Sequence, residues 1–266
     1  VTGPIQVGGV AGRFQGKPTQ VSTLTDAYNT GTVFAENEQG YAGGVVGFLK
    51  DAAVSNVYNT GAVVGQTYIG GLLGNISYSE GTIKPSINNA VWTENQDYTP
   101  KEGYSTAKDS MGSTYYYDHY NVDIPATVIK TSWDAMKQAS TFKDWTGTNA
   151  VATTGNAGTA WRIYEGYTTP LLTSLFKGVA TVAGQEGQTT TYNGMTQLAD
   201  PGKVTFEEPN IDTSYIKVGG SGGRNVGTYN TDFYSEQQGY DIVTDKAYTL
   251  TITPKWLGLS QVLTAL

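Results

Sequence analysis

One tyrosine-rich stretch in the middle of the chain holds the side chains best suited to binding chemistry. It surrounds the only histidine of the sequence, His119. Exposed tyrosines stack on sugar rings or hold a protein partner through an apolar ring and a polar hydroxyl group. The candidate ligand-binding residues are Tyr115, Tyr116, Tyr117 and Tyr120. The alternative is a β insertion whose tyrosines pack against the rest of the domain.

Catalytic and metal chemistry are poorly supported by the residue types. With no Cys and one His, the chain has no disulfides, thiolate nucleophiles or multi-histidine metal sites. Asp118 and Tyr120 flank His119, but an isolated histidine is more often structural than catalytic. Glycosidases need two carboxylates about 5–9 Å apart, and no spacing within 109–123 singles out such a pair. We expect no enzymatic activity and no cofactor. Loop Asp and Asn residues could hold Ca²⁺, yet no Asp-x-Asp-x-Asp spacing indicates it.

Composition and charge narrow the class of protein. The 266 residues include 23 acidic and 16 basic side chains, giving a net charge of −7. This balance argues against a nucleic-acid partner, because phosphate binding needs clustered Lys and Arg. No apolar run reaches the roughly 18 residues of a transmembrane helix. Aromatic residues make up 12% and charged residues only 15%, which favours β structure over disorder.

A glycine-flanked apolar motif occurs three times in the first third of the chain. It reads Gly-Gly-Val-Ala-Gly at 8–12, Gly-Gly-Val-Val-Gly at 43–47 and Gly-Gly-Leu-Leu-Gly at 70–74. A Tyr-Asn-Thr-Gly motif follows the first copy at 28–31 and the second at 58–61. The third follower is degenerate and reads Ile-Asn-Asn-Ala-Val-Trp, ending at Trp92.

These repeats predict strands that stack coil upon coil. One unit has too little apolar surface to fold alone, whereas stacked copies bury a continuous column. Each strand would pair with its equivalent in the next coil, at about 4.8 Å. We therefore expect Tyr28 over Tyr58, Asn29 over Asn59, and a column of the central apolar residues Val10, Val45 and Leu72. The predicted architecture is a right-handed β-solenoid, a β-helix. The alternative is a glycine-rich β-sandwich with similar hairpins.

The two motifs, in this order, resemble the GLUG-type repeat of large bacterial surface proteins. The resemblance covers residues 7–92. Ala11 departs from it, because a bulkier residue is common there, and the third follower lacks Thr-Gly. The family includes filamentous-haemagglutinin-like adhesins, so the resemblance implies an exported protein of the bacterial cell surface.

A predicted cap follows the repeats. Thr131 and Asp134 form a capping-box variant, which predicts a helix through Met136 and Lys137. The Phe-x-x-Trp element and the Pro-Leu-Leu run at 170–172 occur in an order similar to the segment that closes such solenoids. Because a solenoid end exposes an open core, we expect an aromatic plug. Its members are Trp133, Phe142, Trp145 and Trp161.

The last third of the chain changes pattern after a Gly, Gln and Thr-rich boundary at 175–187. The sequence at 248–253 alternates strictly, which predicts a half-buried strand ending at Pro254. Asn-Val-Gly-Thr-Tyr at 225–229 and Leu-Thr-Ile-Thr-Pro at the end of that strand resemble the MBG or YDG-type modules of bacterial adhesins. Asn193 replaces the acidic residue of that family's turn. The resemblance implies a stalk or spacer.

We therefore predict two domains in a mainly β chain. Residues 1–176 form the GLUG-repeat solenoid, with an aromatic insertion at 93–130 and a small helix-containing cap at 131–176. Residues 177–266 form a small β-rich module, whose residues 255–266 lead toward a next repeat.

The predicted function is that of a non-enzymatic fragment of an exported bacterial adhesin, outside the cell or on its surface. It would act as a stalk, a binding surface, or both, for host cells, glycans or matrix. A host-surface glycan or protein is the expected partner, with no nucleic acid and no membrane insertion. The main alternative is a carbohydrate-active β-helix enzyme, a polysaccharide lyase or a glycosidase. An ice-binding solenoid is a further alternative, since Thr30 and Thr60 recur once per repeat.

Overall fold

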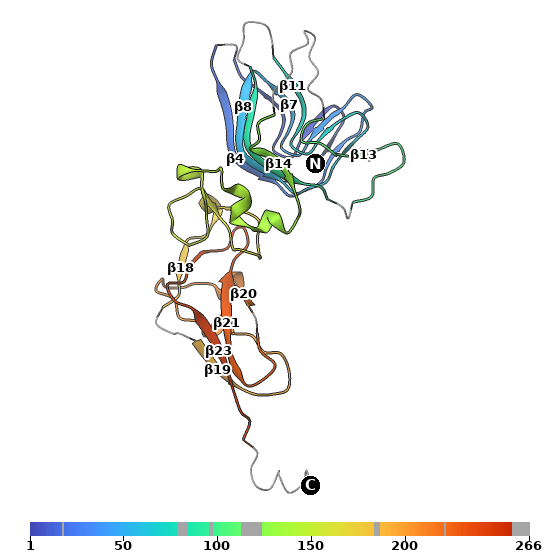
Figure 1. Ribbon diagram of the computed structural model, residues 1–266. Helices are drawn as coiled ribbons and strands as arrows, with labels where there is room; N and C mark the ends of the chain where they lie inside the picture. The colour runs from blue at the N-terminus through green and yellow to red at the C-terminus, as the bar shows by residue number, and fades with distance from the viewer. Residues whose placement is uncertain are drawn as a thin grey trace. The chain divides into compact units, whose positions relative to one another are not determined.

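The chain is mainly β in the computed structural model, as predicted. The structure describes residues 1–17, 19–78, 84–95, 98–112, 124–183, 187–220 and 222–256. Within these ranges there is no helix of seven or more residues and none long and apolar enough to cross a membrane. The chain divides into two compact units, Val1–Val151 and Ala152–Leu266, each drawn in Figure 1.

The first unit repeats a series of four strands, and we call each series a rung. The first rung has β1 (Thr2–Gly3), β2 (Gln6–Gly8), β3 (Ala11–Gln15) and β4 (Ser22–Asn29). The second has β5 (Val33–Ala35), β6 (Tyr41–Gly43), β7 (Val46–Lys50) and β8 (Ala52–Asn59). The third has β9 (Val63–Gly65), β10 (Tyr68–Gly70), β11 (Leu73–Ser77) and β12 (Ser86–Thr93), and β13 (Ser105–Thr106) and β14 (Val128–Thr131) follow.

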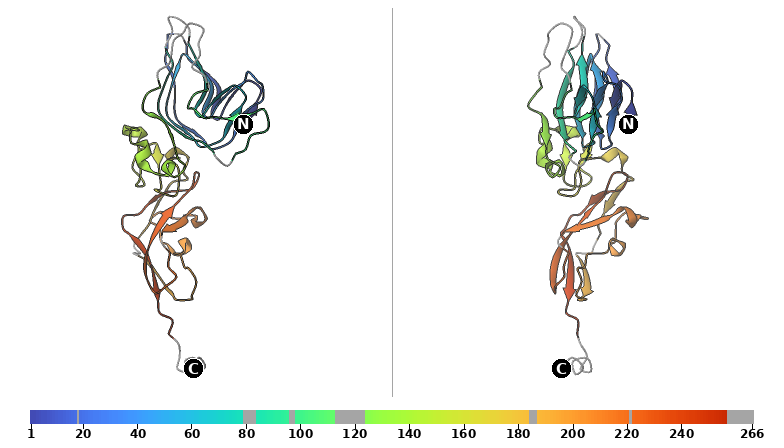
Figure 2. Two further views of the ribbon diagram at one scale, coloured as in Figure 1. Left: turned by 45° about the vertical axis from the view of Figure 1, so that its right-hand side comes forward. Right: turned by 90° about the vertical axis from the view of Figure 1, so that its right-hand side faces the viewer.

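Equivalent strands of successive rungs pair with one another. The sheets have the orders β1-β5-β9-β13, β2-β6-β10, β3-β7-β11 and β4-β8-β12-β14, and every pair is parallel except β9–β13. Figure 2 shows these strands side by side, from blue to green. The Val10 N–H donates to the Val45 carbonyl at 2.9 Å, and the Val45 N–H donates to the Leu72 carbonyl at 2.8 Å. The predicted column of these three residues is confirmed.

Both predicted side-chain ladders are also present. The rings of Tyr28 and Tyr58 stack with centroids 5.0 Å apart and an interplanar angle of 10°. The Asn29 side-chain amide donates to Asn59 Oδ1 at 2.8 Å. Asn59 in turn donates to the carbonyl of Gly61 at 2.9 Å and to that of Gly71 at 3.0 Å, so one buried amide ties two rungs together.

The two sequence motifs interlock, which explains why they recur together. A Cβ at Gly44 would overlap the Asn59 side chain and the Gly71 carbonyl. In the third rung Trp92 takes the position paired with Asn59. A Cβ at Gly71 would overlap the Trp92 ring. The middle glycine is therefore required by the close approach of the following motif.

An aligned backbone bend shapes the longest strand of each rung. Asp26, Asn56 and Asn89 have φ of 54°, 51° and 48°. Asn and Asp tolerate this left-handed conformation better than other non-glycine residues. The Asn89 amide donates to Asn56 Oδ1 at 3.1 Å, so the bends stack as well.

Apolar side chains from all three rungs fill the interior of the unit. The fully buried members include Val33, Val45, Val46, Leu49, Val54, Val57, Leu72 and Leu73. Because the strands are short and the rungs repeat, each residue packs mainly on its equivalents in the neighbouring rungs.

The predicted helix of the cap is replaced by short 3-10 turns. These are η1 (Ala135–Lys137), η2 (Ala139–Phe142) and η3 (Gly147–Asn149). Asp134, at the N-cap of η1, makes no capping hydrogen bond through its side chain. Ser132 does so instead, its hydroxyl oxygen accepting from the Ala135 N–H at 3.2 Å. The turns are too short for the i→i−4 ladder that the capping-box pattern assumes.

The four predicted plug residues do not act together. Phe142 is buried, with its ring centroid 6.3 Å from that of Tyr58, and Trp145 packs on Phe142 at 5.0 Å. They cover a tyrosine of the middle rung, so they pack beside the stack. Trp133 is 50% exposed, and Trp161 belongs to the second unit. The interpretation of all four as one plug was therefore wrong.

The second unit contains strands of two to eight residues, and four of these strands form one sheet. Its first elements are β15 (Val151–Ala152, at the sequence boundary of the units), β16 (Trp161–Arg162), β17 (Leu171–Leu172), η4 (Thr173–Leu175) and β18 (Val179–Thr181). Then come β19 (Gly187–Thr191), η5 (Pro201–Lys203), η6 (Thr213–Tyr215), β20 (Lys217–Gly220), β21 (Gly227–Tyr234), β22 (Asp241–Val243) and β23 (Tyr248–Thr253). The four-stranded sheet has the order β19-β23-β21-β20.

The core of the second unit includes residues that the sequence pattern assigned to the first domain. Tyr164 and Leu171 pack with Phe233, Ile242 and Tyr248. Residues 152–176 therefore lie in the second compact unit, and not with the repeats. Strand β23 alternates as predicted, with Tyr248, Leu250 and Ile252 buried.

Candidate functional site

A groove at the end of the longest strands is the larger of two candidate binding sites. Its volume is about 690 Å³. We call it the threonine groove. It is lined by Thr30, Thr60, Thr93, Glu94, Asn95, Lys130, Thr131, Ser132 and Trp133. All of these residues belong to the first unit.

Four threonines form a row across successive strands. Thr93 pairs in register with Thr131. Thr30 and Thr60 occupy the equivalent position of the two earlier rungs, because each directly follows a residue of the same paired ladder. Thr60 and Thr93 are buried on the floor of the groove, and Thr30 is exposed at one end. A Thr hydroxyl both donates and accepts hydrogen bonds, and the row places one Thr at the end of each of the four strands β4, β8, β12 and β14.

A charged cluster lies beside the third and fourth threonines. Glu94 forms ion pairs with Lys108 and, at 2.7 Å, with Lys130. Hydrogen bonds from Lys108 and Lys130 hold the pKa of the Glu94 carboxyl below its usual range. The Lys130 ammonium also lies 4.9 Å from the centre of the buried Trp92 ring. Glu94 is therefore an ionised hydrogen-bond acceptor with a fixed position.

Trp133 supplies an exposed aromatic surface next to this cluster. Its side chain is 50% exposed, and the Lys137 ammonium lies 5.4 Å from its ring centre. Burying such a ring is normally favourable, so a half-exposed Trp in a groove is a good contact for a ligand with an apolar face. The groove thus combines a row of hydroxyls, one carboxylate, one ammonium group and one aromatic platform.

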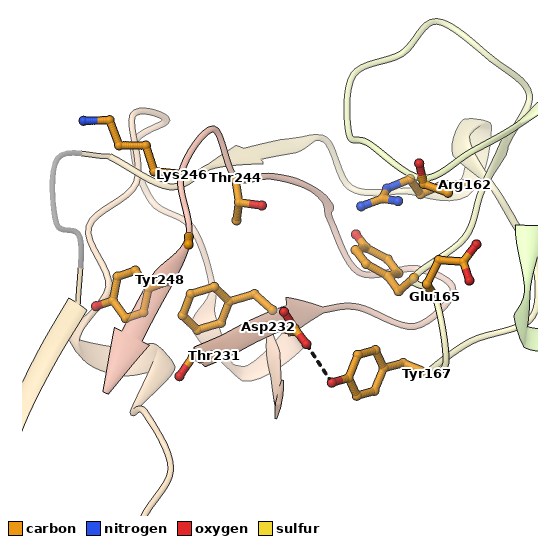
Figure 3. A pocket seen from close by; sticks show the side chains of 12 residues that line it. Arg162, Glu165, Tyr167, Thr231, Asp232, Thr244, Lys246 and Tyr248 are labelled. Atoms are coloured by element: carbon orange, nitrogen blue, oxygen red, sulfur yellow. Dashed lines mark hydrogen bonds between the residues drawn. The ribbon is translucent and has the colours of Figure 1, made fainter. Parts of the chain in front are cut away.

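A second, smaller pocket lies in the second unit and has a volume of about 270 Å³. Figure 3 shows Arg162, Glu165 and Tyr167 on one side of it, and Thr244, Lys246 and Tyr248 on the other. The Tyr167 hydroxyl donates to Asp232 Oδ2 at 2.9 Å.

The polar groups at the base of this second pocket hold the fold together. Arg162 Nε lies 3.3 Å from Asp241 Oδ1, and its guanidinium lies 4.1 Å from the centre of the Tyr164 ring. The Tyr164 hydroxyl donates to the Tyr240 carbonyl at 3.0 Å and accepts from the Ile242 N–H at 2.9 Å. Burial raises the pKa of Tyr164 to about 12. Because these groups bond to one another and to backbone, we regard the threonine groove as the better candidate.

The tyrosines proposed from sequence lie outside the described residues. Tyr115, Tyr116, Tyr117 and Tyr120 fall within the range 113–123, so the ligand-binding hypothesis for them stays a prediction. Elsewhere in the same stretch, Tyr104 packs on Phe34 with ring centroids 4.8 Å apart and donates to the Glu36 carbonyl at 3.0 Å. For this one tyrosine the packing alternative is confirmed.

Sequence reasoning missed most of the groove. It noted Thr30 and Thr60 as a once-per-repeat pair, but it did not extend the row to Thr93 and Thr131. Those two residues lie where the repeat is degenerate, and only the strand register aligns them. The sequence context of Trp133 predicts a buried plug residue, whereas the structure leaves it half exposed in the groove.

No metal centre is found among the residues that the structure describes, where no three His, Cys, Asp or Glu side chains come together. Comparisons with protein-family models, with curated proteins and with solved structures found no match for this chain.

Proposed function

We propose that the first unit is a β-solenoid of GLUG-type coils, and that the chain is part of an exported bacterial surface protein that binds glycans or matrix components. The rung-by-rung register and the interlocking of both motifs support the solenoid. The match in motif order supports the family assignment. The second unit would then act as an MBG or YDG-type spacer.

The observation that carries the binding role is the threonine groove. A row of hydroxyls crosses four paired strands and ends beside an exposed Trp. Ligand sites generally combine an apolar contact surface with a few fixed polar groups. Here the interlocked rungs fix the polar groups, because each threonine follows a paired strand position.

The charge state of Glu94 favours binding over hydrolysis. A general acid at neutral pH needs a raised pKa, whereas two lysines lower the pKa of Glu94. Of the described residues that line the groove, Glu94 is the single carboxylate. A glycosidase needs a pair. The groove therefore suits recognition better than bond cleavage.

A glycan and matrix-protein array tests this function. We expect the full chain to bind at least one glycan or matrix component. Trp133→Ala should weaken that binding at least tenfold, because removal of a large aromatic contact that becomes buried on binding commonly costs about 1.4 kcal/mol or more.

Trp256→Ala is the matched control. This Trp is 89% exposed and lies in the other unit, so its loss should leave binding unchanged. Equal losses in both variants, or a Trp133→Ala variant that binds as well as the parent, would contradict the groove as the binding site. Turnover of an array polysaccharide that Glu94→Gln abolishes would favour the enzyme alternative.

A further inference from the structure

We propose that the threonine groove binds an unbranched, extended polysaccharide that runs across β4, β8, β12 and β14 with about one sugar ring per strand. This inference rests on the function proposed above and names the class of ligand. It follows from the direction of the threonine row, the spacing of the rungs and the position of Trp133 at one end.

The spacing of the threonines matches an extended sugar chain. They lie on four successive paired strands, and neighbouring strands are about 4.8 Å apart. Each ring of an extended β-1,4-linked polysaccharide advances the chain by a distance close to this strand spacing of about 4.8 Å. The ring centres of a chain lying along the row therefore stay nearly in phase with the four threonines. Successive β-1,4-linked rings are turned over relative to one another, so neighbouring threonines meet opposite edges of the chain, and a Thr hydroxyl can serve either edge because it both donates and accepts.

A peptide fits the same row less well. An extended peptide advances by about 3.3–3.4 Å per residue, so its groups would drift out of phase with the threonines. Peptides that add to a sheet use the free backbone groups of an edge strand, whereas this row crosses strands that are already paired. A peptide would therefore lack both the period and the usual backbone partners.

Nucleic acids are also disfavoured. The chain carries a net charge of −7. Among the described residues that line the groove, Lys130 supplies the single ammonium group, and it is paired with Glu94. Phosphate backbones need several uncompensated cations. Sugar hydroxyls, in contrast, can donate to the Glu94 carboxylate and accept from the Lys130 ammonium.

The two ends of the groove offer different contacts, so a bound polysaccharide would have a defined orientation along the row. Trp133 closely follows Thr131 of β14 and lines the groove, so its ring lies at the β14 end of the row and can pack on the apolar face of one sugar ring. Thr30 lies on the first rung, three strands away. A short oligosaccharide held by Trp133 would not reach Thr30, whereas a tetrasaccharide would.

A chain-length series tests this assignment by isothermal titration calorimetry. The probes are cello-oligosaccharides and chito-oligosaccharides of two to six units, with malto-oligosaccharides as the control because their α-1,4 linkage makes them coil. For at least one β-1,4 series, we expect Kd to fall at least tenfold between two and four units and to change less than twofold from four to six.

Substitution at the far end of the row tests the orientation. Thr30→Val should weaken binding of the tetrasaccharide at least threefold and leave the disaccharide unaffected. Thr32→Val is the matched control, since Thr32 is an exposed threonine of the same unit that does not line the groove. It should change neither affinity, and thermal melts should show that both variants are folded.

Three results would overturn the assignment. The first is a Kd that does not depend on length, the second an equal preference for malto-oligosaccharides, and the third no binding of either β-1,4 series. If the chain then binds branched glycans or matrix proteins on the array, the proposed adhesive function stands without this ligand class. If it binds nothing on the array, the adhesive function fails as well.

Discussion

At the scale of single residues, the close contacts between Gly44, Asn59 and Gly71 hold the repeats together. The Asn59 amide is buried and bonds to the carbonyls of Gly61 and Gly71, while its oxygen accepts from Asn29 and from the Gly61 N–H. A buried amide with its hydrogen bonds satisfied is stabilising, and one with a lost partner is costly. The Asn of the Tyr-Asn-Thr-Gly motif therefore fixes the local turn and also the register of its rung against the neighbouring rungs.

Gly44→Ala should lower the free energy of unfolding of the first unit by about 3 kcal/mol or more. The added methyl would overlap the Gly71 carbonyl and the Asn59 amide, neither of which can move without breaking the ladder. Gly31→Ala is the control, because the nearest atom to its Cβ would be Asn29 Oδ1 at an ordinary 3.6 Å. Urea denaturation measures both. Similar losses of unfolding free energy in the two variants would show that Gly44 is needed only for its backbone conformation and not for the close approach of Asn59.

Tyr164 should make the second unit sensitive to alkaline pH. Its pKa is raised from 10.0 to about 12 in the fold by burial. Between these values the unfolded chain releases the proton while the folded chain keeps it. The stabilisation is therefore complete below pH 10 and is lost as pH rises through about 12, on the order of 2–3 kcal/mol.

Unfolding curves between pH 9 and 12 test this for the parent and for Tyr164→Phe. The variant loses two hydrogen bonds and should be less stable at neutral pH. Its stability should nevertheless fall less steeply with pH than that of the parent. Parallel pH profiles would show that Tyr164 titrates normally in the folded protein.

At the scale of elements, sequence predicted the rungs well and the segment after them poorly. The strand ladders followed from exact repetition, since Tyr28 and Tyr58, or Asn29 and Asn59, must stack if the motifs do. After the third rung the motifs no longer recur, so repetition predicts nothing about residues 94–151. Ser132 caps a 3-10 turn where the spacing of Thr131 and Asp134 predicted a helix, because a local pattern does not fix whether a full helical turn follows.

The groove could not be predicted for a related reason. Its first two threonines recur in the motif, but Thr93 and Thr131 enter the row only through the pairing of β12 with β8 and β14. Unequal spacing between the rungs conceals that register in the sequence. The exposure of Trp133 likewise depends on how residues 132–151 pack.

Phe142→Ala should destabilise the first unit by roughly 3–5 kcal/mol. Phe142 is buried between Tyr58 and Trp145, so its removal leaves a cavity beside the middle rung. Trp133→Ala should cost less than about 1 kcal/mol, because that side chain is half exposed. Thermal melts compare the two. If Trp133→Ala destabilised the unit more than Phe142→Ala, Trp133 would be a structural core residue, as its sequence context predicts.

At the scale of the whole molecule, the chain folds into two units, each with its own core. The first unit repeats a series of four strands and carries polar groups at regular intervals. The second is a small β unit with its own aromatic core. Periodic display is useful for a periodic ligand, which is why the proposed recognition of a polysaccharide depends on the stack. If the rungs were not in register, the threonine row would not exist.

Engineered cysteines test that register most directly, because the chain has no Cys of its own. Thr23 of β4 pairs with Ala53 of β8, so Thr23→Cys with Ala53→Cys should form a disulfide readily under mild oxidation. Thr23→Cys with Ser55→Cys, two residues out of register, should form it far more slowly. Equal rates, or faster bonding of the second pair, would contradict the stacked rungs and with them the threonine groove.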